Sequence, residues 1–184
     1  TESMQLTHGV TLYELTTYGI AWLLLSSAML AMVPRRALPA LATMAKVIIV
    51  IALVALTIGS GLAKNPLWDA GAAQALGTWP VLNGLLYVLV LPTAVVAVLG
   101  WQARRNGATG LADQLDRVCL GFVLLAATML IRHAFHVDDM RLLHRFTLLE
   151  AATYSVVWLA AGVGMLAAAT RWDAPMLKLG GKSL

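Results

Sequence analysis

Five long apolar segments limit this chain to one class of fold. They span residues 10 to 33, 38 to 62, 80 to 103, 118 to 136 and 146 to 169. Each is close to the roughly 20 apolar residues that a helix needs to cross a bilayer. Apolar residues make up 60% of the 184-residue sequence and charged residues only 12%, a composition that would expose too much hydrocarbon in water. We therefore predict an all-α integral membrane protein with about five transmembrane helices.

Part of the sequence occurs twice. Met4 to Ile48 aligns with Met140 to Leu184, 136 residues further on, and 17 of the 45 aligned positions are identical. Similarity at a fixed period indicates a repeated structural unit. The identical positions include polar as well as apolar residues, among them His8 and His144, Thr11 and Thr147, Glu14 and Glu150, Tyr18 and Tyr154, Trp22 and Trp158, and Lys46 and Lys182.

The period predicts how the helices are grouped. We expect a tandem four-helix repeat of about 136 residues, in which residues 1–136 form one transmembrane unit and residues 137–184 begin the next. An even number of helices in each unit makes both copies cross the membrane in the same direction. The second copy stops inside the helix that contains Lys182, so we also expect the sequence to be part of a longer chain.

Positive residues between the helices predict the orientation, because cytoplasmic loops carry an excess of Lys and Arg. One side carries Arg35, Arg36, Arg104, Arg105, Arg117, Arg171 and Lys178. On the other side Lys64, Arg132, Arg141 and Arg145 are diluted by Asp69, Asp138 and Asp139. We assign the first side to the cytoplasm, which puts the N-terminus on the outer side.

The repeated polar residues allow two interpretations. Thr11 to Glu14 and Thr147 to Glu150 both fit the capping pattern Ser/Thr-x-x-Glu at a helix start. Spacings of four residues also place each Glu, the following Tyr and the following Trp on one helix face. Such a face could pack tightly against another helix, or it could bind a sugar or a lipid headgroup. The ligand-binding candidates on it are Tyr18, Trp22, Tyr154 and Trp158.

Lys46 is a candidate for a transport pathway. If its helix begins near Leu38, Lys46 lies about 12 Å into the membrane, where an isolated ammonium costs about 2.5 to 3.5 kcal/mol. Its side chain either extends back to the cytoplasmic surface or meets a buried partner. Asn83 and Arg132 are further ligand-binding candidates, and we expect Arg132 to form a solvated turn network with Asp138 and Asp139. Pro92 lies near the middle of the third helix, where it removes one backbone hydrogen bond and is expected to kink the helix.

All four histidines are predicted on the outer side. His133 and His136 are three residues apart and share a helix face, so they could converge with His144 on a metal ion. Histidines near a membrane surface also serve as interfacial hydrogen-bonding groups, and this is the interpretation that we favour. We predict no metal ion and no cofactor.

Three groups of residues resemble a known family. They are Glu14-x-x-x-Tyr18-x-x-x-Trp22 followed by an Arg-rich turn, Pro39 and Lys46; Pro80-Val-Leu-Asn83-Gly-Leu-Leu-Tyr87 with Pro92; and Ile131-Arg-His-Ala-Phe-His136 leading to Glu150-x-x-x-Tyr154-Ser-x-x-Trp158. They resemble the bacterial predicted membrane proteins called domain of unknown function 2339. The resemblance implies a long multi-pass chain in the bacterial inner membrane, and it transfers no reaction.

Three classes of function are compatible with these residues. The first is a transporter-like or envelope ligand-binding membrane module. The second is a membrane enzyme acting on a lipid-linked glycan or acyl substrate at the outer leaflet, and its weak catalytic candidates are Glu14, Glu150, His133, His136 and His144. The third is a structural membrane scaffold. Expected partners are membrane lipids and further transmembrane helices, either of the same longer chain or of partner subunits. No nucleic acid is expected, because no stretch interleaves basic and aromatic residues.

Overall fold

The computed structural model describes residues 10–36, 39–77, 79, 83–136, 140–142 and 145–172. Within these residues all regular structure is helical, and each long helix corresponds to an apolar segment of the sequence. The elements in chain order are α1 (Leu12–Arg36), α2 (Pro39–Ala55), the π-helix η1 (Leu56–Ala63), α3 (Ala70–Ala75), the π-helix η2 (Leu86–Val90), α4 (Leu91–Arg105), α5 (Thr109–Phe135) and α6 (Leu148–Trp172).

Five helical stretches are long and apolar enough to cross a membrane. They are Leu12–Val33, Pro39–Ala63, Leu86–Arg105, Thr109–Phe135 and Leu148–Met165. The prediction of an all-helical protein with about five membrane-spanning helices is therefore confirmed. The repeat and its division at residue 136 stay predictions, although α1 and α6 begin and end at aligned positions of the two copies.

The fourth membrane-spanning helix begins nine residues before the predicted start at residue 118, at Thr109. The apolar segment begins later because Asp113, Asp116 and Arg117 precede it, and we expected these three residues to form a short amphipathic lead-in to the helix. The structure shows that α4 and α5 both continue past their apolar parts, and Arg104 at the end of α4 pairs with Asp116 of α5. A polar helix end thus has a neighbouring helix to pair with, so the backbone remains helical beyond the apolar segment.

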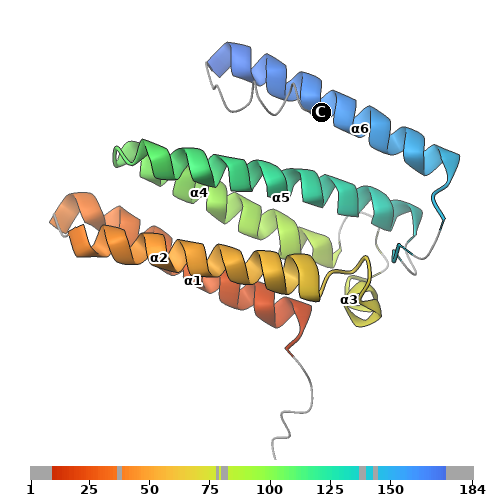
Figure 1. Ribbon diagram of the computed structural model, residues 1–184, viewed down its shortest axis with the longest axis horizontal. Helices are drawn as coiled ribbons and strands as arrows, with labels where there is room; N and C mark the ends of the chain where they lie inside the picture. The colour runs from red at the N-terminus through yellow and green to blue at the C-terminus, as the bar shows by residue number, and fades with distance from the viewer. Residues whose placement is uncertain are drawn as a thin grey trace, which may run out of the picture.

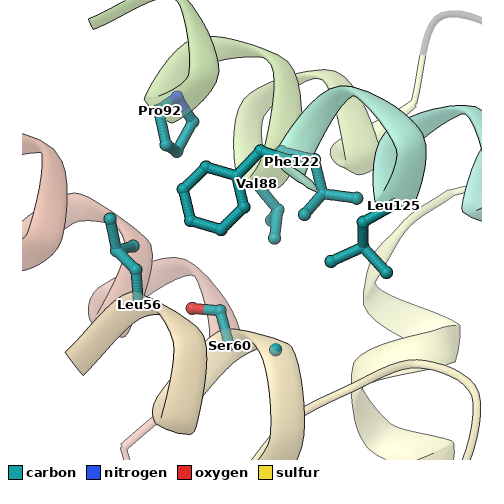
Figure 2. Close-up of a pocket in the computed structure, with 8 residues that line it drawn as sticks. Leu56, Ser60, Val88, Pro92, Phe122 and Leu125 are labelled. Atoms are coloured by element: carbon teal, nitrogen blue, oxygen red, sulfur yellow. The ribbon is translucent and has the colours of Figure 1, made fainter. Parts of the chain in front are cut away.

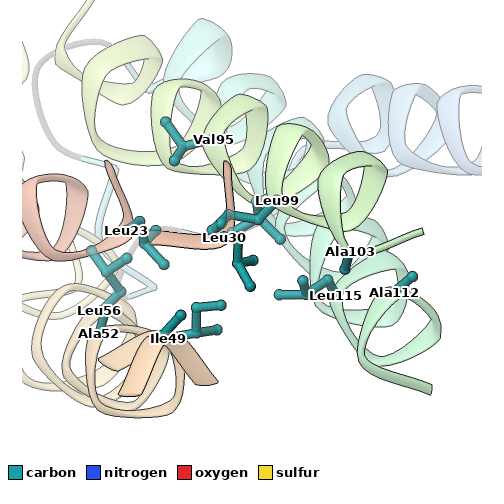
Figure 3. Packing of buried hydrophobic residues seen from close by; sticks show 12 residues of the cluster. Leu23, Leu30, Ile49, Ala52, Leu56, Val95, Leu99, Ala103, Ala112 and Leu115 are labelled. Atoms are coloured by element: carbon teal, nitrogen blue, oxygen red, sulfur yellow. The ribbon is translucent and has the colours of Figure 1, made fainter. Parts of the chain in front are cut away.

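The long helices lie side by side, as Figure 1 shows, with α6 on the outer side of α5 and away from α1 and α2. The short helix α3 lies at the end of the bundle where α1 and α6 begin and α5 ends, which we call the α3 end. The main core joins α1, α2, α4 and α5, and it includes the buried side chains of Leu23, Ile49, Leu99 and Leu115 (Figure 3).

A second apolar cluster lies at the α3 end. Leu76 at the end of α3 and Leu85 directly before η2 pack there with Leu12 of α1, Met129 of α5 and Met140 of the segment after α5. All five side chains are 3% exposed or less. This cluster fixes the end of α5 and the segment that follows it, which together hold the most polar part of the buried interior.

Both π-helices interrupt membrane-spanning segments. The η2 turns run directly into α4 at Pro92, the second residue of that helix. Proline lacks an amide hydrogen, so the normal backbone hydrogen bond is lost there and a locally wider helix is a common adjustment. In η1, the Ser60 hydroxyl lies 3.3 Å from the Thr16 hydroxyl of α1. The helix type changes just before Pro92, and the expected kink stays a prediction.

Candidate functional site

A buried ion pair joins α5 to α6. Arg132 lies in the last turn of α5 and Glu150 in the first turn of α6, and their side chains are 1% and 0% exposed. One terminal guanidinium nitrogen of Arg132 donates to both Glu150 oxygens, Oε1 at 2.8 Å and Oε2 at 3.0 Å. Hydrogen bonds between charged groups are among the strongest in proteins. This pair is the centre of the candidate site.

The other Arg132 donors hold the segment between the two helices. Nε donates to the Met140 carbonyl at 3.1 Å, and the second terminal nitrogen donates to the Arg141 carbonyl at 2.8 Å. The guanidinium carbon also lies 4.7 Å from the centre of the Phe146 ring. The planar guanidinium suits this combination of donors and an aromatic face. Arg132 thus connects the end of α5, the following segment and the start of α6.

Glu150 has two further polar contacts. Nε2 of His136 lies 2.9 Å from Oε2 of Glu150, and the Thr147 hydroxyl accepts a hydrogen bond from the Glu150 backbone amide at 3.1 Å. The Thr147 contact is half of the predicted capping box. The carboxylate itself does not complete that box, because it is bound to Arg132 and His136. We name Arg132, His136 and Glu150 the polar clamp.

Local sequence explains how the clamp forms. Arg132 and His136 are four residues apart, which brings their side chains to the same side of α5. Glu150 lies in the first turn of α6, where the positive end of the helix dipole favours a carboxylate. One turn further along, the Tyr154 hydroxyl donates to the Thr128 carbonyl at 3.3 Å. The α6 face with Glu150 and Tyr154 therefore packs on the α5 face with Arg132 and Thr128.

The histidines of α5 have different partners. His133 is fully buried, and its Nε2 lies 3.2 Å from the Trp79 carbonyl, whereas His136 binds Glu150. His144 and His8 lie outside the described residues. Among the residues that the structure describes, no three His, Cys, Asp or Glu side chains come together as metal ligands. The two described histidines therefore serve different contacts, His133 with the segment before the third spanning helix and His136 with the first turn of α6.

The predicted environment of Arg132 needs correction. We expected a solvated turn network with Asp138 and Asp139, both of which lie outside the described residues. The structure buries Arg132 and pairs it with Glu150, 18 positions away in the sequence. The signal that could have found this pair is Arg-x-x-x-His at the end of one apolar segment, with a Glu at the start of the next. The carbonyls of Thr128, Met140 and Arg141 carry no such signal.

The first copy of the repeated motif is arranged differently. Glu14 Oε2 accepts hydrogen bonds from the Thr11 amide at 2.7 Å and the Thr11 hydroxyl at 2.9 Å, and the Glu14 amide donates to the same hydroxyl at 3.2 Å. This is the complete capping box. Glu14 is exposed, and Tyr18 and Trp22 are 61% and 48% exposed. The Glu, Tyr and Trp side chains of the motif are thus buried or half-buried on α6, whereas those on α1 are exposed.

The remaining candidates lie apart from the clamp. Lys46 is exposed on α2 and pairs with no carboxylate in the described part of the chain. The Asn83 side chain accepts a hydrogen bond from the Leu85 amide at 2.9 Å, where the third long helix begins. Trp158 is half-buried on α6, as is Tyr154. Ligand binding at these residues stays a prediction.

A small pocket lies between the helices, away from the polar clamp. Figure 2 shows its lining from η1, η2, α4 and α5, with Leu56, Val88, Pro92 and Phe122 among the apolar walls. Its polar side chain is Ser60, which is already within hydrogen-bond distance of Thr16. The space is about that of one water molecule, so this pocket is too small for an organic ligand.

The fold and the buried ion pair define a multi-pass helical membrane protein in which a polar contact joins neighbouring spanning helices. Comparison with known families agrees with a membrane protein: the family described as Predicted membrane protein (DUF2339) matches residues 1–184. The chain belongs to this family. No curated protein and no solved structure matches it.

Proposed function

We propose that this part of the chain is a structural membrane module, in which the polar clamp holds α6 against the bundle formed by α1, α2, α4 and α5. The observation that carries the proposal is the complete burial of the Arg132–Glu150 pair. A charged side chain inside a membrane protein is costly unless it is paired. Each charge here has its partner on the neighbouring helix, so separating α6 from α5 would leave two charges in an apolar environment.

The two other functional hypotheses receive less support from this geometry. An enzyme that uses Glu150 as acid or base needs the carboxylate within reach of its substrate, and Glu150 is 0% exposed. A transporter-like or envelope ligand-binding module needs a polar cavity, whereas the residues around the described pocket are mostly apolar. The transport idea also relied on Lys46 meeting a buried partner, and Lys46 is exposed.

We further infer that the module lies in a bacterial inner membrane with the α3 end on the outer side. Membership in a family of predicted membrane proteins supports the membrane location. The distribution of Arg and Lys supports the orientation, since the opposite end carries Arg104 and Arg105 at the end of α4 and Arg117 in the first part of α5. Accessibility of single introduced cysteines to a membrane-impermeant reagent in intact cells tests both inferences.

The structural role is tested by removing first one charge of the clamp and then both. Glu150→Gln leaves Arg132 buried without its counter-charge, and breaking a buried pair in this way costs about 3–5 kcal/mol. Combining Arg132→Met with Glu150→Leu removes both charges, and such replacements are often neutral or stabilising. We expect a strongly lowered unfolding temperature for the single variant and recovery in the double variant, measured on the full-length protein in nanodiscs.

Asp69→Asn is the matched control. Asp69 forms an ion pair with Lys64 at 3.3 Å, and the two side chains are 22% and 40% exposed. Exposed pairs contribute about 0–1 kcal/mol, so this variant should unfold close to the unmodified protein. A Glu150→Gln variant that is no less stable than Asp69→Asn would contradict the structural role and return Glu150 to the ligand-binding and catalytic hypotheses.

A further inference from the structure

The same stripe of residues occurs on α1 and α6, and only one of the two is covered. On α6 the stripe consists of Glu150, Tyr154 and Trp158. Glu150 is buried, and the two aromatic side chains are half-buried. On α1 the aligned residues are Glu14, Tyr18 and Trp22, and all three are exposed. In both cases spacings of four residues place the side chains on one face. Among the described residues the α1 stripe is therefore left open, whereas its counterpart on α6 packs on α5.

The other faces of α1 are already in contact with the bundle. The Tyr13 hydroxyl donates to the Ala75 carbonyl of α3 at 2.8 Å, and the Thr17 hydroxyl lies 2.7 Å from that of Tyr87 in η2. Thr16 faces Ser60 of η1, and Leu23 belongs to the main core. The α1 stripe faces away from these contacts and is exposed, as are Leu24, Leu25 and Met32 elsewhere on α1.

The covered stripe indicates the chemistry of the absent partner. On α5, Arg132 meets Glu150, and the Thr128 carbonyl one turn away meets Tyr154. His136, one turn in the other direction, meets the second Glu150 oxygen. A helix covering the α1 stripe in the same way would present an arginine opposite Glu14 and a histidine four residues beyond it. Such an arginine would give Glu14 an ion-pair partner in place of the Thr11 hydrogen bonds of its capping box.

We propose that the α1 stripe docks against a further transmembrane helix built like α5, which carries Arg-x-x-x-His at the end that lies level with Glu14. The proposal rests on the structural role of the α5–α6 contact. A second copy of this bundle does not supply the helix, because its Arg132 is already buried with its own Glu150. One difference is expected: Val10 stands where the second copy has Phe146, so no aromatic ring covers the partner's arginine.

Photocrosslinking tests this docking in the full-length protein in its own membrane. Benzoylphenylalanine replaces Trp22 in one variant and Trp158 in another, and the crosslinked peptides are identified by mass spectrometry. Position 158 should crosslink to α5. Position 22 should crosslink to one helix that contains arginine with histidine four residues later. Position 50 on α2, where Val50 is 59% exposed, is the lipid-facing control and should yield no discrete protein crosslink.

Charge variants connect the crosslink to the ion pair. Glu14→Gln should lower the yield at position 22 several-fold and leave the yield at position 158 unchanged, which also shows that the variant inserts and folds. Exchanging the two charges, with Glu14→Arg and the partner's arginine changed to Glu, should restore the yield at position 22.

Three outcomes overturn the proposal: crosslinks to lipid alone, crosslinks to any segment of a second copy of this bundle, or crosslinks to a helix without a basic residue level with Glu14. Failure at position 22 with success at position 158 contradicts this inference alone. Failure at both positions contradicts the structural role of the α5–α6 contact as well.

Discussion

At the scale of single residues, the same short motif has two different structural outcomes. Thr11 and Glu14 form a complete capping box at the start of α1. The Glu150 carboxylate instead binds Arg132 and His136. The backbone geometry is similar, since in both copies the threonine hydroxyl accepts from the glutamate amide. The neighbouring helix makes the difference, because a charged donor at hydrogen-bond distance competes with the helix-end amide for the carboxylate.

Asp69 gives a pH-dependent prediction outside the membrane-spanning segments. Its carboxylate caps α3 by accepting a hydrogen bond from the Ala72 amide at 3.1 Å. That bond, together with the ion pair to Lys64, holds the pKa of Asp69 below its ordinary value. A lowered pKa in the folded state stabilises the fold above the unfolded-state pKa of about 3.9, and this stabilisation is lost as the pH falls.

We therefore expect hydrogen-exchange protection of α3 to decrease below about pH 4 in the unmodified protein. Asp69→Asn keeps an N-cap that does not titrate, so its α3 protection should not change over this range. Asp69→Ala should weaken α3 at every pH, by about 1 kcal/mol. Equal pH dependence in the unmodified protein and the Asn variant would show that Asp69 is not the titrating group.

At the scale of elements, close helix contacts depend on small side chains. Gly19 of α1 faces Leu56, and a Cβ atom added at Gly19 would lie 2.5 Å from the Leu56 side chain. Leu56 is 3% exposed and belongs to the main core, so it has little room to move. Small residues at such contacts let helices in membranes approach closely. The contact between α1 and η1 therefore requires glycine at position 19.

Gly19→Ala should destabilise the protein by about 1–3 kcal/mol, the usual cost of an overpacked core. Gly121→Ala on α5 is the control, because an added Cβ there has no neighbour within 4 Å. Replacing a helical glycine without a clash stabilises by about 0.5–1 kcal/mol. Opposite shifts in unfolding temperature are the expected result, and a shift in the same direction for both variants would contradict the close contact.

At the scale of the whole molecule, the helices are held in two different ways. Helices α1, α2, α4 and α5 share one continuous apolar core. Helix α6 packs mainly on α5, and the large side chains of Leu149, Leu159 and Val163 on it are 59% exposed or more. In lipid, exposed apolar side chains give little drive for helix association, so polar contacts and close packing decide it. We therefore expect the position of α6 to depend on the polar clamp.

Distances between spin labels measure this dependence. In a Cys119→Ala background, labels at Val50 on α2 and Val163 on α6 should give a narrow distance distribution that Glu150→Gln broadens. Labels at Val50 and Val98 report on α2 and α4 and should be unaffected by the same change, because their helices share the apolar core. Broadening of both pairs would mean that the clamp stabilises the entire bundle and not α6 specifically.

Much of this architecture could be predicted from the sequence. The apolar segments predicted five membrane-spanning helices, because the length of an apolar run and the thickness of a bilayer are matched locally along the chain. The capping box at Glu14 was predictable for the same reason, since its partner is three residues away. Helix ends that depend on a neighbour were predicted less well, as the early start of α5 at Thr109 shows.

The partners of the buried charges follow from the three-dimensional arrangement. Thr-x-x-Glu reads the same at both sites, yet Glu150 is buried and Glu14 is exposed. Arg132 looked like a residue of a solvated turn and is instead 1% exposed. The physical reason is that a charged side chain can be buried in an apolar environment only where a neighbouring helix supplies its partner. That neighbour is set by packing over the whole bundle, and Arg-x-x-x-His followed by a Glu in the next helix indicates only that such a pair can form.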